Sequence, residues 1–279
     1  MLFATTVLVA ALWAPQATDT TLPAVRGTRL AVNNFSGRIT VTGWTRNEVQ
    51  IRSTSEDDEA ELRVESSSGE IRVSQRMRNG PTDMDVTINA PAWMAVSLQG
   101  TETDIVVSGI AAPIKAQSVS GDITVSGGAD NVSLNSVDGD VRAEGTRGTL
   151  DIQAVDGDVS VRDLTGALTI QGVDGDLRLE SITSSAVRVS SVDGDVAFDG
   201  PFSASGSYSF KTHDGDLTIR PAGTVNATVS VSTWNGEFES SIPVTITGSQ
   251  EGKRFSFTLG TGSARVELES FDGQIRLVH

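Results

Sequence analysis

A short turn motif repeats through the middle of the chain and constrains its fold more than any other feature. The tripeptide D-G-D occurs at 138–140, 156–158, 174–176, 193–195 and 214–216, and the variant S-G-D occurs at 120–122. From Gly121 to Gly215 the motif glycines follow one another at intervals of 18, 18, 18, 19 and 21 residues. A nearly constant period of this length indicates a stack of similar units, each resting on its neighbours.

Each copy places apolar residues at alternating positions on both sides of the glycine. One copy supplies Leu150, Ile152, Val155, Val159 and Val161. Alternation of this kind predicts β-strands with one buried face, and branched side chains favour that conformation. The Asp-Gly step marks a tight turn, because glycine accepts positive φ without a steric clash. We expect all five apolar residues to line the core, including the valine directly before the turn.

Two all-β architectures fit this pattern. Asp-Gly between alternating runs is a strong hairpin signal, so a hairpin-based sandwich or meander is one of them. The constant period favours the other, a single-stranded parallel β-solenoid with coils of about 18–21 residues. We expect irregular coils over 22–110, regular coils over 111–240 and further irregular coils over 241–279, with the two irregular regions capping the stack.

The apolar residue before each turn supports the prediction of caps. Its column is Phe35, Val119, Val137, Val155, Val173, Val192, His213, Trp234 and Phe271. The aromatic residues are at the two ends of this column, and a solenoid must protect its terminal coils from edge-to-edge pairing. We therefore expect wider closing coils at both ends.

The N-terminal segment reads as a secretory leader. The first 18 residues carry no charged side chain, and Leu2 to Trp13 is mostly apolar, with small residues at Ala14 and Ala17. This composition predicts a signal peptide over 1–17, although a basic start is missing, so the true start of the leader can lie upstream. We expect an exported protein, periplasmic, secreted or on the bacterial cell surface, with no transmembrane span in the mature chain.

The composition excludes several kinds of partner and site. The chain has 36 acidic and 21 basic residues, which gives a net charge of −15 and argues against binding to nucleic acid. It contains no cysteine, so neither a disulfide nor a thiolate metal site can form. A negative surface leaves cation binding and simple solubility open.

Two terminal segments resemble a known family. R-G-T-R-L-A-V-N-N-F-S-G-R-I-T-V-T-G-W (26–44) is similar to the N-terminal module of the bacterial putative-adhesin family with β-strand repeats. T-L-G-T-G-S-A-R-V-E-L-E-S-F-D-G-Q-I-R-L (258–277) is similar to the closing segment of that family, and the middle resembles its iterated V-x-G-D-V coils. The resemblance implies an envelope-associated or secreted β-solenoid and implies no catalytic residues.

No enzyme motif stands out. The chain has two histidines, of which His279 is the final residue and His213 occupies the column that valine fills in other coils. We expect His213 to be a half-buried corner residue. No nucleophile elbow, P-loop, zinc-protease motif or dinucleotide fingerprint occurs. We expect no catalytic residues, no bound organic cofactor and no enzymatic activity.

Acidic residues beside the motif glycines form the one candidate site. Stacked coils are about 4.8 Å apart, so two exposed carboxylates in neighbouring coils repel by about 0.9 kcal/mol in water. Turn N–H groups bonded to the aspartate before the glycine, nearby arginines such as Arg142, Arg162 and Arg178, or bound Ca²⁺ could offset this repulsion. The candidate calcium ligands are Asp138, Asp140, Asp156, Asp158, Asp174, Asp176, Asp193, Asp195, Asp214 and Asp216.

The sequence as a whole favours an exported, non-enzymatic scaffold of the bacterial envelope. Long polar faces would bind a repetitive partner such as a glycan or an envelope protein. Two alternatives remain open at this point: a carbohydrate-active β-helix enzyme and a self-assembling structural element. A catalytic pair is normally singular and held in a cleft, whereas these carboxylates repeat in coil after coil.

Overall fold

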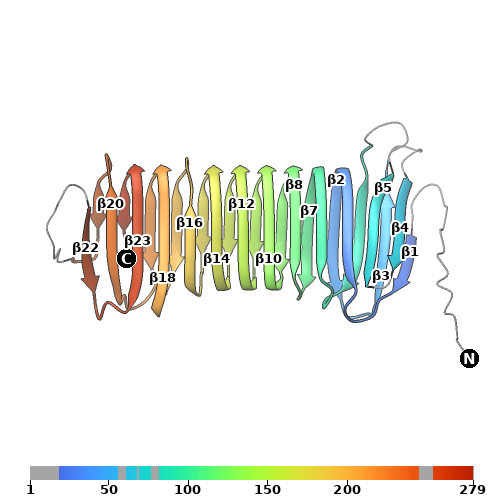
Figure 1. The fold of residues 1–279 in the computed structure, drawn as a ribbon, viewed down its shortest axis with the longest axis horizontal. Helices are drawn as coiled ribbons and strands as arrows, with labels where there is room; N and C mark the ends of the chain where they lie inside the picture. The colour runs from blue at the N-terminus through green and yellow to red at the C-terminus, as the bar shows by residue number, and fades with distance from the viewer. Residues whose placement is uncertain (1–18, 56–60, 68, 77–81, 245–253, 279) are drawn as a thin grey trace, which may run out of the picture.

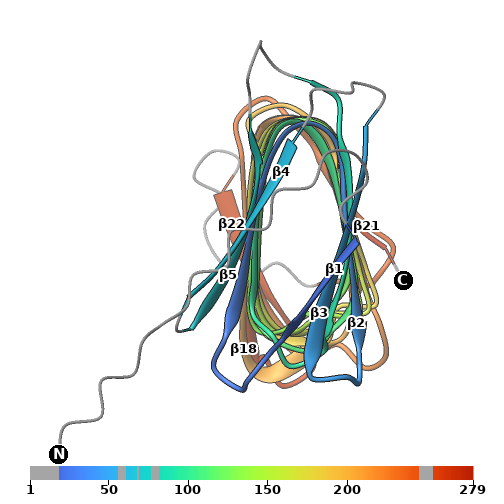
Figure 2. The same ribbon diagram turned by 90° about the vertical axis from the view of Figure 1, so that its right-hand side faces the viewer.

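A computed structural model describes residues 19–55, 61–67, 69–76, 82–244 and 254–278. The regular structure in this part of the chain is all β, and its 24 strands belong to one mostly parallel sheet. The sheet winds into a long solenoid, which is a flattened oval when viewed along its axis (Figures 1 and 2). The predicted leader over 1–17 lies outside the described residues. No described helix is long and apolar enough to cross a membrane.

Parallel pairing runs through the regular middle on both faces. Face A consists there of β8 (Ile114–Ser120), β10 (Ala129–Asp138), β12 (Arg147–Asp156), β14 (Thr165–Asp174), β16 (Ser184–Ser190) and β18 (Phe202–Asp214). Face B consists there of β9 (Ile123–Gly127), β11 (Val141–Glu144), β13 (Val159–Arg162), β15 (Leu177–Glu180), β17 (Val196–Gly200) and β19 (Leu217–Pro221). The hairpin alternative is therefore wrong for this region.

The register places equivalent residues of successive repeats above one another. On face A, Val132 pairs with Leu150, and Leu150 pairs with Leu168. On face B, Val141 pairs with Val159. These side chains point inward and are almost completely buried, so the alternation in the sequence correctly predicts them as core.

The motif glycines connect the two faces at one corner of the oval. Gly157 has φ of 124°, and a Cβ atom on it would lie 2.5 Å from the carbonyl oxygen of Gly139 in the coil below. The glycine is thus required by its backbone conformation and by the close approach of its neighbour. Thr103 takes this position in the coil formed by β7 (Val96–Ile110), and it pairs with Gly37.

At the N-terminal end the spatial order departs from the chain order. β2 (Arg29–Trp44) lies between β7 on one side and β5 (Glu70–Arg76) and β6 (Asp85–Pro91) on the other. Beyond them are three strands in antiparallel pairs, β1 (Asp19–Pro23), β3 (Glu48–Thr54) and β4 (Glu61–Ser67). The coil formed by β2 is therefore second from the end of the stack, although it precedes the outer coil of β5 and β6 in the chain.

The C-terminal end has the same kind of arrangement. β23 (Ala264–Asp272) lies between β18 and β20 (Ala227–Thr233), and β24 (Ile275–Leu277) lies between β19 and β21 (Phe238–Ser240). β22 (Arg254–Leu259) pairs antiparallel with β20 at the end of the stack. The coil of Gly273 is thus inserted between the coils of Gly215 and Gly236, so Phe271 comes before Trp234 in the predicted column.

Candidate binding surface

The valine before each turn is on the surface, which corrects the expectation that it lines the core. The side chains of Val119, Val137, Val155, Val173 and Val192 are 45–51% exposed. The reason lies in the repeat itself. Leu150 and Val155 are five positions apart, and an odd offset in a strand moves a side chain to the opposite face. These five valines form a continuous apolar ridge along the edge of face A.

Small residues take the inward position that the valines were expected to fill. In successive coils this position holds Ser118, Ser136 and Ala154, whose side chains are buried at the corner where the two faces meet, and Gly172, which has no side chain. The Ser118 hydroxyl donates to the Thr103 carbonyl over 2.8 Å, so this corner also uses polar contacts.

Aromatic side chains extend the valine ridge toward the C-terminal end. The His213 ring stacks on Phe271 with centroids 4.7 Å apart, and Phe271 stacks on Trp234 at 5.9 Å. Trp234 is 69% exposed and Phe271 is 42% exposed. His213 is also exposed, so the expectation of a half-buried corner histidine is wrong.

A column of amide side chains runs beside the valine ridge on the same outward face. Each amide precedes a ridge valine by two residues, so both point away from the core. Gln117 pairs with Asn135, Asn135 with Gln153, and Gln153 with Gln171. We call the eight residues of these four coils the amide–valine strip: Gln117, Asn135, Gln153, Gln171, Val119, Val137, Val155 and Val173.

Only part of the hydrogen-bonding capacity of this amide column is used within the protein. Gln117 accepts a bond from the Gln99 amide over 3.3 Å, and the Asn135 amide approaches the Ser133 hydroxyl at 3.5 Å. In the part of the chain that the structure describes, Gln153 and Gln171 form no side-chain hydrogen bond. Donors and acceptors of both amides thus remain open to solvent.

Toward the C-terminal end the amide column gives way to charged side chains. Lys211, which aligns with the amide column, lies 3.2 Å from Glu267 and 2.8 Å from Glu269. The hydrogen bond to Glu269 raises the pKa of Lys211 above its usual value. Burial acts to raise the pKa of Glu267, but hydrogen bonds from Lys211 and Ser209 outweigh it and leave that pKa lowered. The amide–valine strip is thus bordered here by a charged cluster.

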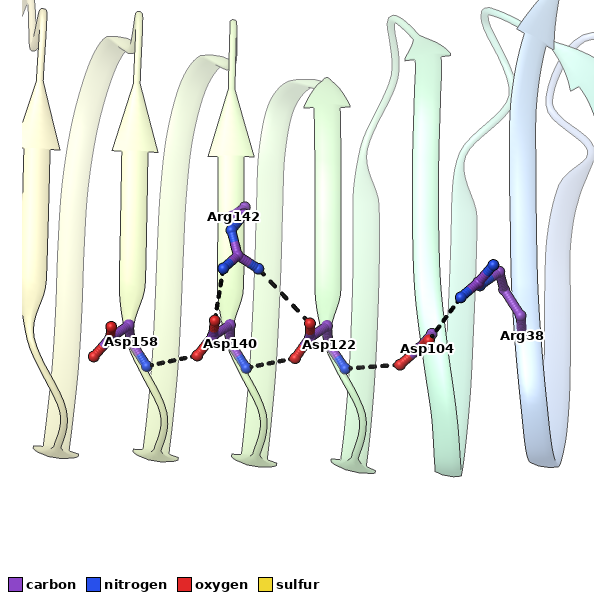
Figure 3. A network of polar contacts seen from close by, with 6 residues as sticks. All are labelled: Arg38, Asp104, Asp122, Asp140, Arg142 and Asp158. Carbon is purple, nitrogen blue, oxygen red and sulfur yellow. Dashed lines mark hydrogen bonds and ion pairs between the residues drawn. The ribbon is translucent and has the colours of Figure 1, made fainter.

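The aspartates after the motif glycines form a hydrogen-bonded ladder between coils (Figure 3). The Asp140 N–H donates to Oδ1 of Asp122 over 2.9 Å, and the Asp158 N–H donates to Oδ1 of Asp140 over 3.0 Å. The ladder starts at Asp104 and ends where the Gln274 N–H donates to Asp216. We call it the inner column: Asp104, Asp122, Asp140, Asp158, Asp176, Asp195 and Asp216.

Arginines neutralise the inner column at a few points. Arg142 lies 2.6 Å from Asp140 and 3.7 Å from Asp122, so it bridges two coils (Figure 3). Arg276 pairs with Asp216 at 2.9 Å. The suggested pairing of Asp158 with Arg162 is not formed, because Arg162 pairs with Glu180 at 3.0 Å.

The aspartates before the glycines behave differently. We call them the outer column: Asp138, Asp156, Asp174, Asp193, Asp214 and Asp272. All six side chains are exposed. In the described residues none of their carboxylates accepts a hydrogen bond or forms an ion pair. The turn N–H bonds suggested for this column are therefore absent, and the backbone bonds are accepted by the inner column instead.

The candidate calcium ligands belong to both columns. The structure places Asp140, Asp158, Asp176, Asp195 and Asp216 in the inner column and Asp138, Asp156, Asp174, Asp193 and Asp214 in the outer one. No group of three or more acidic or histidine side chains within the described ranges is close enough to hold a metal ion. Calcium binding stays a prediction.

The amide column is not among the candidate sites that the sequence predicts above, although the sequence contains a signal for it. Aligning the copies on their glycines places Gln117, Asn135, Gln153 and Gln171 at one position, four residues before the glycine. These neutral side chains are neither typical catalytic groups nor typical metal ligands, so motifs for catalysis and metal binding do not include them. A search for any polar residue type kept at one position of the repeat would have found them.

Comparison with known proteins places the chain in a family. Residues 56–202 and 114–278 match the Toastrack DUF4097 family, and these overlapping matches cover well over half of the chain. The chain belongs to this family. The resemblance to the bacterial adhesin family is thereby confirmed. No curated protein matches the chain.

Several solved structures are similar. A putative adhesin from Parabacteroides distasonis is 10% identical, with 94% of this chain and 97% of that chain covered and a TM-score of 0.50. A putative adhesin from Bacteroides fragilis is 12% identical, with 94% and 97% covered and a TM-score of 0.46. A putative cell adhesion protein from Clostridium sporogenes is 10% identical, with 95% and 99% covered and a TM-score of 0.24. At these identities the first likeness concerns the fold alone.

Proposed function

We propose that this Toastrack protein is an exported, non-enzymatic scaffold of the bacterial envelope that binds a repetitive partner, a glycan or an envelope protein, along its side. One observation carries the proposal. The apolar ridge exposes an equivalent valine in five successive coils and continues into exposed aromatic rings. Single exposed apolar residues are ordinary, whereas a contiguous apolar surface marks an interaction site.

The arrangement of the acidic groups supports a binding role over catalysis. Each carboxylate of the inner and outer columns has near-identical neighbours in the next coil, so no acid–base pair is distinguished from the others. A hollow at the C-terminal end is lined by Gly223, Thr224, Val225, Ile242, Pro243, Leu259 and Gly260. This lining carries no titratable side chain, so it offers no general acid or base.

The strands at the two ends support a scaffold over end-to-end assembly. β1, β3 and β4 at one end and β22 at the other are held in antiparallel pairs. We infer that these strands cap the regular 18–21-residue coils, since a second copy could not continue the parallel stack across them. The neighbour from Parabacteroides distasonis is named a putative adhesin, and that name agrees with an exported location and a binding role.

Binding of the exported, purified protein to bacterial envelope fractions tests this function. We expect saturable binding that falls at least tenfold in the variant V137T/V155T/V173T, because threonine keeps the branched shape and removes an apolar methyl group. A control variant, T124S/S160A/R178S, changes outward-facing positions on face B, of which Arg178 is exposed and Thr124 and Ser160 are half-buried, and it should bind as the wild type does. Equal binding by wild type and ridge variant, or hydrolysis of the fraction by the protein, would contradict the proposal.

A further inference from the structure

The amide–valine strip combines hydrogen-bonding groups without charge and an apolar ridge. Along strands β8, β10, β12 and β14, the outward positions next to the amides hold Lys115, Ser133, Asp151 and Thr169. The strip and these neighbours together carry one positive and one negative charge, in a protein with a net charge of −15. Each amide offers two donors and an accepting oxygen.

From this chemistry we infer that the partner is an uncharged polysaccharide, bound along the strip and parallel to the solenoid axis. The inference rests on the proposed function and names the class of its partner. Sugar hydroxyls both donate and accept hydrogen bonds, as amides do, and Gln153 and Gln171 have these groups free. The C–H face of a pyranose ring is apolar, so it can pack on the valines beside the amides.

The spacing of the strip favours a sugar chain over an extended peptide. Equivalent groups recur at the coil spacing of about 4.8 Å. The rise per residue of an extended pyranose chain is close to this distance, so successive rings can meet successive coils. Residues on one side of an extended peptide are about 6.7 Å apart, and they fall out of step with the coils within a few residues.

Charge argues against two other occupants. The outer column borders the ridge directly, since Asp138, Asp156 and Asp174 follow Val137, Val155 and Val173 in sequence. These carboxylates carry no counter-ion within the described residues, so they repel an anionic polymer. A second copy of the protein would add another outer column and another charge of −15.

The stacked rings of His213, Phe271 and Trp234 lengthen the apolar side of this surface by three coils. Aromatic side chains provide large apolar contact area at low entropic cost. We expect the affinity to rise with the length of the sugar chain until the chain spans both the strip and this stack. A single sugar should bind weakly, because it engages only one coil.

The test uses calorimetry of the purified protein with soluble probes: laminarin, mannan, xyloglucan and dextran as uncharged glycans, alginate as an anionic one and chitosan as a cationic one. We expect at least one uncharged glycan to bind, with little dependence on salt. The variant Q117S/N135S/Q153S/Q171S keeps the face polar but shortens its side chains, and it should weaken binding at least tenfold. T124S/S160A/R178S serves again as the control, and circular dichroism checks that each variant is folded.

A second measurement separates this inference from the proposed function. Envelope fractions are treated with periodate, which oxidises sugar diols, or with protease, and binding of the wild type is measured again. Loss after periodate together with loss in the amide variant supports an uncharged glycan. Binding that survives periodate and is lost after protease, binding that is limited to alginate or chitosan, or binding that reflects self-association in sedimentation overturns the inference and leaves the scaffold function to its own test. Absence of any binding to untreated fractions defeats both.

Discussion

Two columns of aspartate flank the same column of glycines, and they take different parts in the structure. The inner column accepts backbone N–H groups from neighbouring coils, as when Asp158 accepts from Asp176 over 2.9 Å. The outer column, two residues earlier in each turn, has no such partner in the described residues. Chemically identical side chains thus stabilise the stack in one column and repel one another in the other. The local sequence D-G-D alone does not separate these two roles, because the difference arises only between coils.

The largest expected effect comes from the glycine between the two columns. In Gly157→Ala, the new methyl group would lie 2.5 Å from the Gly139 carbonyl at φ of 124°, so we expect a loss of roughly 3 kcal/mol in unfolding free energy. Gly145 has φ of 69° and no atom within 4 Å of an added Cβ. Gly145→Ala should therefore cost only about 1 kcal/mol. Urea titrations followed by circular dichroism measure the unfolding free energy of both variants. Equal losses would show that the close approach of Gly157 to the Gly139 carbonyl adds no cost.

The next largest effect concerns the inner column. Asp158→Ala removes the acceptor of the Asp176 N–H, and we expect a loss of about 1.5 kcal/mol, typical of a hydrogen bond to a charged group. Asp158→Asn keeps an accepting oxygen and should lose less than about 0.5 kcal/mol, which is the range for a surface substitution. If urea titrations show the same loss of unfolding free energy for both variants, the oxygen that accepts the Asp176 N–H does not stabilise the stack.

A smaller effect of opposite sign is expected in the outer column. D138N/D156N/D174N removes three exposed charges that have no partner, so its melting temperature at low salt should be slightly above that of the wild type. The gain should shrink as salt is added, since the Debye length falls to about 10 Å at 0.1 M. The matched change in the inner column, D122N/D140N/D158N, should lower the melting temperature instead. A lower melting temperature for the outer variant would show that its carboxylates contribute contacts.

Calcium should have the smallest effect. The inner carboxylates already accept backbone bonds, and the described residues contain no group of three acidic side chains arranged to hold an ion. If calcium binds the outer column, millimolar Ca²⁺ should raise the melting temperature slightly more than Mg²⁺ does at the same ionic strength, and a chelator should reverse the rise. An equal effect of the two cations, or a rise with Ca²⁺ that D138N/D156N/D174N leaves unchanged, would contradict a calcium ladder in the outer column.

The repeat predicts the middle of the fold well because there each coil meets only copies of itself. Leu150, Ile152, Val159 and Val161 are buried as their alternation predicts, and glycine recurs where the turn needs positive φ. Val155 is apolar but exposed, because its odd offset from Leu150 places its side chain on the outer face of the strand. The sequence therefore contained the position of the ridge, and strand periodicity alone was enough to find it.

The ends could not be predicted in the same way. Gly236 and Gly273 lie in similar motifs, and nothing local tells which of them stacks on Gly215. That choice depends on contacts between segments far apart in the chain, such as the pairing of Phe210 with Leu268. The hydrogen bonds of the inner column could not be predicted from local sequence either, because they join residues that are one whole coil apart.

The inserted coil at the C-terminal end has a consequence for how the protein reaches its final form. β23 and β24 separate β18 and β19 from β20 and β21, although they follow all four in the chain. During synthesis the chain appears from its N-terminus, so β20 to β22 emerge before the segment on which they rest. They cannot dock permanently until that segment arrives, and an early attachment to β18 would occupy its place. Completion of the solenoid is therefore delayed until β23 and β24 are available, and a chain interrupted before Ala264 loses an interior coil of the finished stack.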